Sequence, residues 1–260
     1  PVRCGPVRVV LPGAEAVIAT FERAAGAVAE VLVGTTDWGA SGLRIGQYAV
    51  DLAADQACLD VLYDAGYRVL SEESGVTGPP GSDDAPIVVV DPLDGSTNAS
   101  RGVPWYATAL CLVDGDGPAV AMVHNHAIRD TFVAVRGGGA ERNGAAIRPS
   151  VTTDLDRALL GVSGLPERHY GWAQFRAMGA SAPDICMVAC GVTDAWCDMG
   201  AHHGVWDYLA SVLIVTEAGG VAGEVHGREL CVLDHTARRG PVVAATPELL
   251  AAVLARRAGR

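Results

Sequence analysis

The sequence predicts a mixed α and β protein with layered sheets. Three observations indicate this class: two helical segments come first, a group of apolar strand-like runs follows, and helices and strands then alternate. Because a sheet and an amphipathic helix must each bury an apolar face, blocks of this kind stack as layers around a shared core. A chain of 260 residues, half of them apolar, is long enough to bury such a core.

The first half of the chain predicts two helices and then a sheet. Residues 14–33 repeat Ala, Val, Ile and Leu at helical spacing before Gly34, and residues 48–65 predict a second helix. The wholly apolar, β-branched run at 87–90 indicates a buried strand. Antiparallel strands of a meander are predicted from three further apolar runs separated by turn residues, at 107–113, 118–123 and 130–135.

The second half predicts alternating elements. Strands are expected at 159–162 and 242–245. Helices are expected at 167–178, 184–190 and 205–218, and from Pro247 to about Arg257. Since no internal repeat or long linker divides the chain, we expect one domain over residues 1–260, with two lobes at approximately 1–153 and 154–260.

Composition excludes several classes of protein. Asp and Glu number 30 against 19 Lys and Arg, so the formal charge of −11 repels polyanions such as nucleic acids. The seven cysteines form no CxxC pair, which argues against a disulfide framework or a zinc knuckle. There is no apolar run of transmembrane length and no visible signal peptide. We therefore expect a cytoplasmic protein that binds neither nucleic acid nor membrane.

The segment from Asp91 to Asn98, Asp-Pro-Leu-Asp-Gly-Ser-Thr-Asn, carries the strongest chemical signal. The predicted strand delivers Asp91 to its C-terminal end, Asp94 lies close by, and the carbonyl of Leu93 lacks a regular ladder partner. Two carboxylates and a free carbonyl are the hard oxygen ligands that Mg²⁺ prefers. The backbone N–H groups that could hold a phosphate at a helix start are those of Gly95, Ser96 and Thr97. The alternative is an Asx-rich turn that caps a helix.

Two other acidic segments are ambiguous when taken singly. Glu72 and Glu73 follow a predicted strand, and adjacent acids at such places are common on protein surfaces. Asp207 follows Trp206 at the start of a predicted helix that ends in Glu-Ala-Gly-Gly at 217–220. An N-cap explains Asp207 alone, although a helix start can also hold a carboxylate at the edge of a cavity.

The chain carries three motifs in the order E-E, D-P-L-D-G-S-T-N and W-D-(nine residues)-E-A-G-G. In this order they resemble the inositol monophosphatase family. The resemblance extends from the first helix to about residue 246. The resemblance implies a five-layered αβαβα α+β sandwich, a homodimer, sensitivity to lithium, and two or three Mg²⁺ per site. The metal ligands that it implies are Glu72, Asp91, the Leu93 carbonyl, Asp94 and Asp207. Glu73 would order water outside these ligands.

Other positions match the family more loosely. Asp51 fits the Asp of a T-x-x-D signature in which Tyr48 takes the Thr position, and is a further candidate catalytic residue. Ser96 stands where Thr is usual and keeps the hydroxyl that helps Glu72 to orient the attacking water. The family's substrate-contact loop is resembled by Gly179, Ala180 and Ser181.

A family acid that contacts a sugar hydroxyl precedes the Trp-Asp pair, and Asp198 is the candidate here. It lies nine residues before Asp207, a longer gap than usual, and His202 and His203 fall inside this gap. Neighbouring histidines point apart and are more often surface residues than ligands.

A competing interpretation concerns residues 110–117, which look like the hhhhDxDG motif of haloacid-dehalogenase phosphatases. Asp114 would then be a covalent nucleophile. That motif should lead into a long helical crossover, whereas the apolar run at 118–123 follows at once. A β-hairpin with an Asp-Gly turn is therefore favoured.

The sequence thus predicts metal-dependent hydrolysis of a small phosphate monoester by an activated water, with inositol 1-phosphate as the leading substrate. Histidinol phosphate is an alternative, since its amine could pair with Asp198. A 3′-phosphonucleotide is a further alternative, although only three Phe are present to stack on a base. A fructose bisphosphatase would need a basic second phosphate site that no motif provides. The last alternative is a non-catalytic, phosphate-binding regulatory protein.

Overall fold

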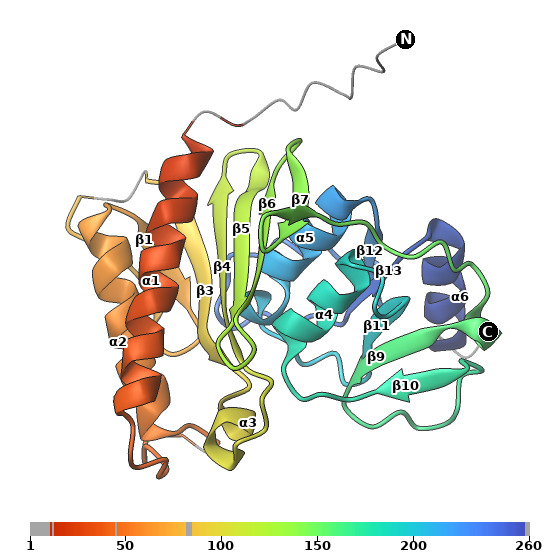
Figure 1. Ribbon diagram of the computed structural model, residues 1–260, viewed down its shortest axis with the longest axis horizontal. Helices are drawn as coiled ribbons and strands as arrows, with labels where there is room; N and C mark the ends of the chain where they lie inside the picture. The colour runs from red at the N-terminus through yellow and green to blue at the C-terminus, as the bar shows by residue number, and fades with distance from the viewer. Residues whose placement is uncertain (1–10, 12, 45, 82–84, 258–260) are drawn as a thin grey trace.

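The computed structural model describes residue 11 and residues 13–44, 46–81 and 85–257, in five layers (Figure 1). Helices α1 (Ala14–Gly34) and α2 (Ala49–Asp64) cover one face of an eight-stranded sheet. Helices α4 (Ser181–Ala189) and α5 (Leu209–Ala218) lie between this sheet and a five-stranded one. Helix α6 (Pro247–Arg257) covers the outer face of the second sheet. The predicted αβαβα layering is confirmed.

The first sheet has the order β2-β1-β3-β4-β5-β6-β7-β8. Its strands are β1 (Arg68–Ser71), β2 (Gly75–Thr77), β3 (Ile87–Asp94), β4 (Ala107–Asp114), β5 (Gly117–Asn125), β6 (Asp130–Val135), β7 (Gly139–Arg142) and β8 (Ala145–Ala146). Strands β1 and β3 pair in parallel, and the other neighbours are antiparallel. The parallel pair matters for the site, because both strands end at the same edge of the sheet.

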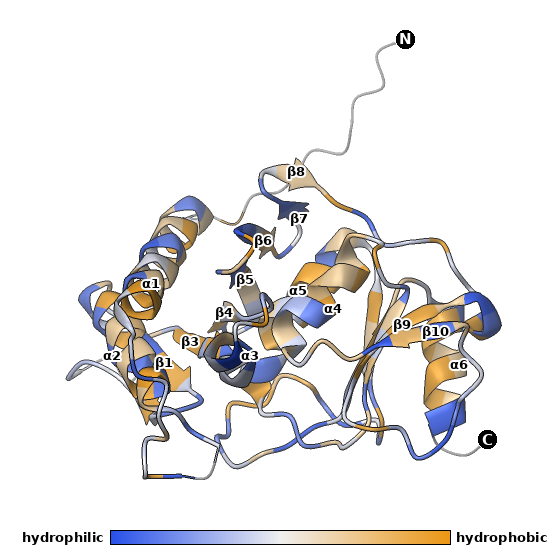
Figure 2. Cartoon of the chain, turned by 60° about the horizontal axis from the view of Figure 1, so that its bottom comes forward, coloured by the Kyte–Doolittle hydropathy of each residue, from blue (hydrophilic) through white to orange (hydrophobic). Residues whose placement is uncertain are grey.

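Strand β3 is buried on both faces, which explains its wholly apolar start. Val88 and Val90 pack in the cluster formed with α1 and α2, whereas Ile87 and Val89 pack in the cluster formed with α4 and α5. Successive side chains of a strand point to opposite faces, so a central strand between two helical layers must be apolar at every position. Figure 2 shows this hydrophobic colouring along β1, β3 and β9.

A bulge interrupts the pairing of β3 with β4 at the metal motif. Asp91 lies opposite Ala109 and Asp94 opposite Ala107, so two residues of β3 face one residue of β4. The Thr108 hydroxyl, from β4, donates a hydrogen bond of 2.7 Å to the Pro92 carbonyl. Since proline has no N–H to give to the ladder, the bulge is expected at this position.

The second sheet has the order β10-β9-β11-β13-β12. Its strands are β9 (Leu159–Ser163), β10 (Gln174–Arg176), β11 (Ala195–Asp198), β12 (Val221–Glu224) and β13 (Pro241–Ala244). Three short helices complete the fold: α3 (Ser96–Arg101), η1 (Leu155–Arg157) and η2 (Val205–Asp207). The division into two lobes near residue 153 stays a prediction.

The helix predicted over 167–178 is wrong. This segment is irregular until β10, which pairs in parallel with β9. Gly171 has φ +100°, outside the range of a right-handed helix. Tyr170 and Trp172 flank it, are both buried, and pack edge to face with ring centroids 5.4 Å apart. Aromatic packing against the second sheet therefore overrides the helical pattern.

The remaining predictions hold with shifted ends. The segment at 205–218 divides into η2 and α5, and the helix predicted over 184–190 spans Ser181–Ala189. Asp114 and Gly117 pair across the antiparallel β4–β5 hairpin, which confirms the hairpin over the dehalogenase motif. Among the described residues no helix is long and apolar enough to cross a membrane. The described cysteines are free, and Cys4 lies outside the described residues.

Candidate active site

Three acids from separate elements meet at the carboxyl ends of β1 and β3. Glu72 follows β1, Asp91 lies in β3, and Asp207 ends η2. One carboxylate oxygen from each lies within 4.8 Å of the others. Asp94, four positions from the end of the apolar run, is also buried and close enough that its charge acts on Glu72 and Asp91. The structure thus brings the four acids that were predicted as metal ligands together.

Backbone N–H groups orient the aspartates. Asp91 accepts a hydrogen bond of 3.0 Å from the Leu93 amide, and Asp207 accepts one of 2.7 Å from the Gly204 amide. The amide of Ala182, in the first turn of α4, donates to Asp94 at 2.6 Å. Each bond fixes one oxygen of its carboxylate. Such fixed oxygens are what a cation site requires, because little reorganisation remains when the ion binds.

The electrostatics of the cluster favour a cation. Burial, followed by the charge of Asp207, raises the pKa of Glu72 to about 8, and the same two causes raise the pKa of Asp94 to about 8. Burial also raises the pKa of Asp91 and of Asp207. Carboxylates that repel one another in a buried site are stabilised as anions by a bound metal ion. All of these potential ligand atoms are oxygens, and such a donor set fits a hard divalent cation such as Mg²⁺.

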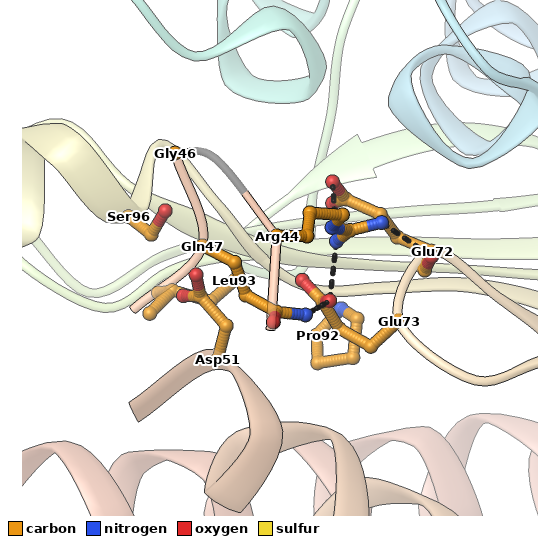
Figure 3. A pocket seen from close by; sticks show the side chains of 9 residues that line it. All are labelled: Arg44, Gly46, Gln47, Asp51, Glu72, Glu73, Pro92, Leu93 and Ser96. Atoms are coloured by element: carbon orange, nitrogen blue, oxygen red, sulfur yellow. Dashed lines mark hydrogen bonds and ion pairs between the residues drawn. The ribbon is translucent and has the colours of Figure 1, made fainter. Parts of the chain in front are cut away.

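A cavity of about 140 Å³ opens beside the acids (Figure 3). Its lining includes Glu72, the predicted carbonyl donor Leu93, Ser96 and Asp51. Asp51 accepts a hydrogen bond of 2.8 Å from the Tyr48 amide on Oδ2, while its buried Oδ1 has no hydrogen-bond partner among the described residues. Burial raises the pKa of Asp51 to about 6. An unpaired buried oxygen next to the cavity is suited to hold a water or a cation-bound water.

Glu73 is held by the loop between α1 and α2. Its carboxylate accepts hydrogen bonds from the Arg44 guanidinium and from the Gln47 amide (Figure 3). Arg44 also lies 3.6 Å from Glu72 Oε1. These contacts place a positive charge at the edge of the acid cluster.

The predicted phosphate segment packs against the predicted substrate loop. Gly95 has φ +85°, and a Cβ on it would lie 2.8 Å from the Cβ of Ala180, so only glycine fits. The side chain of Asn98 donates two bonds of 2.8 Å, to the carbonyls of Trp105 and Met178. Gly95 therefore packs closely against Ala180, and Asn98 ties the phosphate segment to the residue before Gly179.

At the substrate end, Asp198 is buried and engaged. Its carboxylate accepts hydrogen bonds from the amides of Gly200 at 2.7 Å and His202 at 3.1 Å, and Oδ2 lies 2.8 Å from His203 Nδ1. The other ring nitrogen of His203 lies 2.7 Å from the Ser181 hydroxyl. Burial alone would raise the pKa of Asp198, but His203 and the two amides hold it below its usual range. His203 is therefore not a surface residue, whereas His202 is exposed.

Sequence reasoning missed several residues of the site. Asn98 belongs to the motif, but its bond to Met178 spans 80 positions and has no local signal. The ring of His235 lies 2.9 Å from the Glu72 carbonyl and stacks on Trp206, again across a long separation. Arg44 had a weak signal, since it is the only Lys or Arg between Arg23 and Arg68.

The fold and the acids define an α+β protein with a carboxylate cluster that could hold a metal ion. The model of the inositol monophosphatase family matches residues 47–259, and the chain belongs to that family of phosphatases.

Two relatives are similar to the chain in sequence, and one solved structure is similar to it in fold. The Nus factor SuhB of Escherichia coli strain K12 is 31% identical over 223 residues, covering 79% of this chain and 80% of that protein. The fructose-1,6-bisphosphatase/inositol-1-monophosphatase of Methanothermobacter thermautotrophicus is 35% identical over 216 residues, covering 75% and 77%. The extragenic suppressor protein suhB from Bartonella henselae superposes with a TM-score of 0.80 at 24% identity, over 93% of this chain and 98% of that one.

Proposed function

We propose that this protein is a magnesium-dependent phosphomonoesterase whose leading substrate is a small polyol monophosphate, inositol 1-phosphate first. The observation that carries the proposal is the cluster of Glu72, Asp91 and Asp207, whose oxygens converge within 4.8 Å beside a cavity. Membership of a phosphatase family supports the reaction class. Two or three Mg²⁺ per site, a homodimer and inhibition by Li⁺ are parts of the same proposal, and they rest on the family resemblance.

The residues that would hold Mg²⁺ are Glu72, Asp91, the Leu93 carbonyl, Asp94 and Asp207. Bound Mg²⁺ would neutralise phosphate oxygens, lower the pKa of a water molecule and stabilise the leaving alkoxide. The aspartates would hold the ions through carboxylates that the amides of Leu93, Ala182 and Gly204 orient.

The remaining groups orient the reactants. Glu72 and Ser96 both line the cavity, and we assign them to hold the attacking water. Asp51 lies beside Ser96 and can keep the serine hydroxyl directed towards that water. The amides of Gly95, Ser96 and Thr97 are assigned to the phosphate, in the segment that packs against the loop at 179–181. No covalent protein intermediate is required.

The substrate end favours a neutral alcohol over a cationic one. The Asp198 carboxylate is already engaged by two amides and by His203, so its charge is not free to attract the amine of histidinol phosphate. Burial would lower the pKa of His203, but Asp198 and then Asp207 raise it, which favours a positive ring near the bound alcohol. A polyol can instead exchange hydrogen bonds with the Ser181 hydroxyl, which His203 orients.

A panel of phosphate esters tests the substrate. Phosphate release is measured with inositol 1-phosphate, histidinol phosphate, a 3′-phosphonucleotide and fructose 1,6-bisphosphate, each with saturating Mg²⁺. We expect the highest kcat/KM for inositol 1-phosphate. An advantage of tenfold or more for another ester would overturn this substrate assignment and leave the reaction class intact.

A regulatory role is the second candidate, favoured by the relative in Escherichia coli that is called a Nus factor. A non-catalytic phosphate-binding protein would keep the fold but would release no phosphate from any ester of the panel.

A further inference from the structure

The positively charged side chain of Arg44 lies next to the acid cluster. It lies on the loop between α1 and α2, and its guanidinium pairs with the carboxylate of Glu73. A guanidinium N–H also lies 3.6 Å from Glu72 Oε1, and another lies 3.5 Å from the Glu72 carbonyl (Figure 3). One side chain thus reaches both acids of the Glu72-Glu73 pair.

The loop holds Arg44 in this place. The Ser41 hydroxyl donates a hydrogen bond of 2.6 Å to the Gln47 side chain, whose amide group in turn donates to Glu73. The Ser41 amide also donates to the Gln47 carbonyl at 2.9 Å. Ser41 and Gln47, on either side of Arg44, are therefore joined to each other, and Gln47 is attached to Glu73.

Arg44 and a metal ion compete for the same side of the cluster. The cavity beside Glu72 is lined by three acids, Asp51, Glu72 and Glu73, and by Arg44 as a cation. A divalent ion bound to Glu72 Oε1 on this side would face a guanidinium a few ångströms away, and like charges at such distances repel strongly when partly buried. Among the described residues no ion pair joins Asp91 or Asp207 to Arg44, so these two acids are free of this conflict.

We propose that the positively charged side chain of Arg44 takes the place of a metal ion beside Glu72 and Glu73. The site therefore binds one divalent ion fewer than its carboxylates could hold. This inference rests on the proposed function, because it assumes that Glu72, Asp91 and Asp207 bind metal. The Arg44 guanidinium interacts with the carboxylates of both Glu72 and Glu73. Without it, a hydrated metal ion would have to balance these two negative charges.

Calorimetric titration of the metal-stripped full-length protein with Mn²⁺ tests the proposal. Arg44→Gln and Arg44→Met both remove the charge, and each should bind one more Mn²⁺ per chain than the wild type. Arg44→Lys keeps the charge and should keep the wild-type number. Arg148→Gln, which removes a charge from an exposed arginine, is the matched control and should also keep it. In chelator, the two neutral variants should unfold about 2–4 °C below the wild type, and saturating Mn²⁺ should abolish this gap.

The possible failures are distinguishable. If the wild type binds Mn²⁺ and both neutral variants bind the same number, the role of Arg44 is refuted and the proposed function stands. If the wild type binds no Mn²⁺, the proposed metal chemistry itself is refuted, and this inference with it. The folded state of each variant is checked by its unfolding transition, and Arg44 is 43% exposed, so its replacement should leave the fold intact.

Discussion

The metal end and the substrate end of the site are built in different ways. At the metal end, Asp91 and Asp94 share a strand with one local bulge, and the Leu93 amide, two positions along the chain, orients Asp91. The amide that orients Asp94 comes from Ala182, which is distant in sequence. At the substrate end, Ser181, Asp198 and His203 come from α4, from β11 and from the segment before η2, and His203 contacts both of the others.

This difference indicates which features of a functional site a short sequence motif can encode. A strand that ends in Asp-Pro-Leu-Asp sets the positions of its own carboxylates, so the motif alone implies an oxygen-rich site. The positions of residues from separate elements depend on the length of each connection, and the His203 ring, from the gap before Asp207, contacts Asp198. We therefore expect substitutions at the metal end to remove activity and those at the substrate end to change selectivity.

The largest effect is expected at Asp94. Asp94→Asn keeps the shape of the side chain but removes the charge that would hold a metal ion. We expect kcat for the preferred ester to fall by at least ~10²-fold, equivalent to about 2.7 kcal/mol of transition-state stabilisation. Steady-state phosphate release measures the loss, and circular dichroism checks that the fold is kept.

Asp114→Asn is the matched control for Asp94→Asn. The Asp114 carboxylate pairs with Arg136 at the β4–β5 hairpin, away from the acid cluster, with a shortest distance of 2.7 Å. It should keep near-normal kcat. An active Asp94→Asn together with an inactive Asp114→Asn would show that the dehalogenase-type mechanism operates instead.

A smaller effect is expected at His203. His203→Gln removes the ring that neutralises Asp198, so the carboxylate would attract a cationic alcohol. We expect the preference for inositol 1-phosphate over histidinol phosphate, as a ratio of kcat/KM values, to shrink by about tenfold, or 1.4 kcal/mol. Little change is expected in the Mg²⁺ requirement.

His202→Gln provides the comparison for His203→Gln. The exposed His202 contacts Asp198 through its backbone amide, which the substitution leaves in place. Its selectivity should match the wild type. Equal selectivity in both variants would exclude His203 as a determinant of the substrate.

The smallest effect concerns the stability of the metal-free protein. Glu72 and Asp94 have pKa values raised to about 8 from ordinary values of 4.5 and 3.8. Between about pH 5 and pH 8 the folded state therefore binds more protons than the unfolded state, and the free energy of unfolding falls as pH rises. In chelator we expect Tm to be lower at pH 8 than at pH 6 by about 4 °C or more.

Mg²⁺ should reverse this loss at pH 8, because an ion that binds only the folded state stabilises it. Calorimetric scans with and without Mg²⁺ measure both effects. A Tm in chelator that rises from pH 6 to pH 8 would contradict the proposed repulsion among the acids.

Much of the fold followed from patterns in the sequence, and the failures have physical causes. The apolar run at 87–90 predicted β3, because burial on both faces leaves no other composition. The helix over 167–178 failed, since the burial of Tyr170 and Trp172 beside Gly171 depends on a sheet that the segment itself does not encode. Strand β11 was not predicted because its residues, Ala, Trp, Cys and Asp, lack the β-branched run that marked 87–90.

The residues of the site also fall into those that the sequence predicted and those that it did not. The motif placed Asp91 and Asp94 in one turn, and resemblance added Glu72 and Asp207. Contacts across many positions had no sequence signal, and the bond from Arg44 to Glu73 and the chain from Asp198 through His203 to Ser181 became visible only in three dimensions.

The central claim is that the acid cluster binds the ions that drive hydrolysis of a phosphate ester. The most direct measurement is phosphate release from inositol 1-phosphate by the purified protein, first in EDTA and then with Mg²⁺ restored in excess. We predict no detectable release in EDTA and recovery of activity with Mg²⁺, since four converging acids cannot work together without cations. Full activity in the chelator, or none after Mg²⁺ is restored for any ester of the panel, would contradict it.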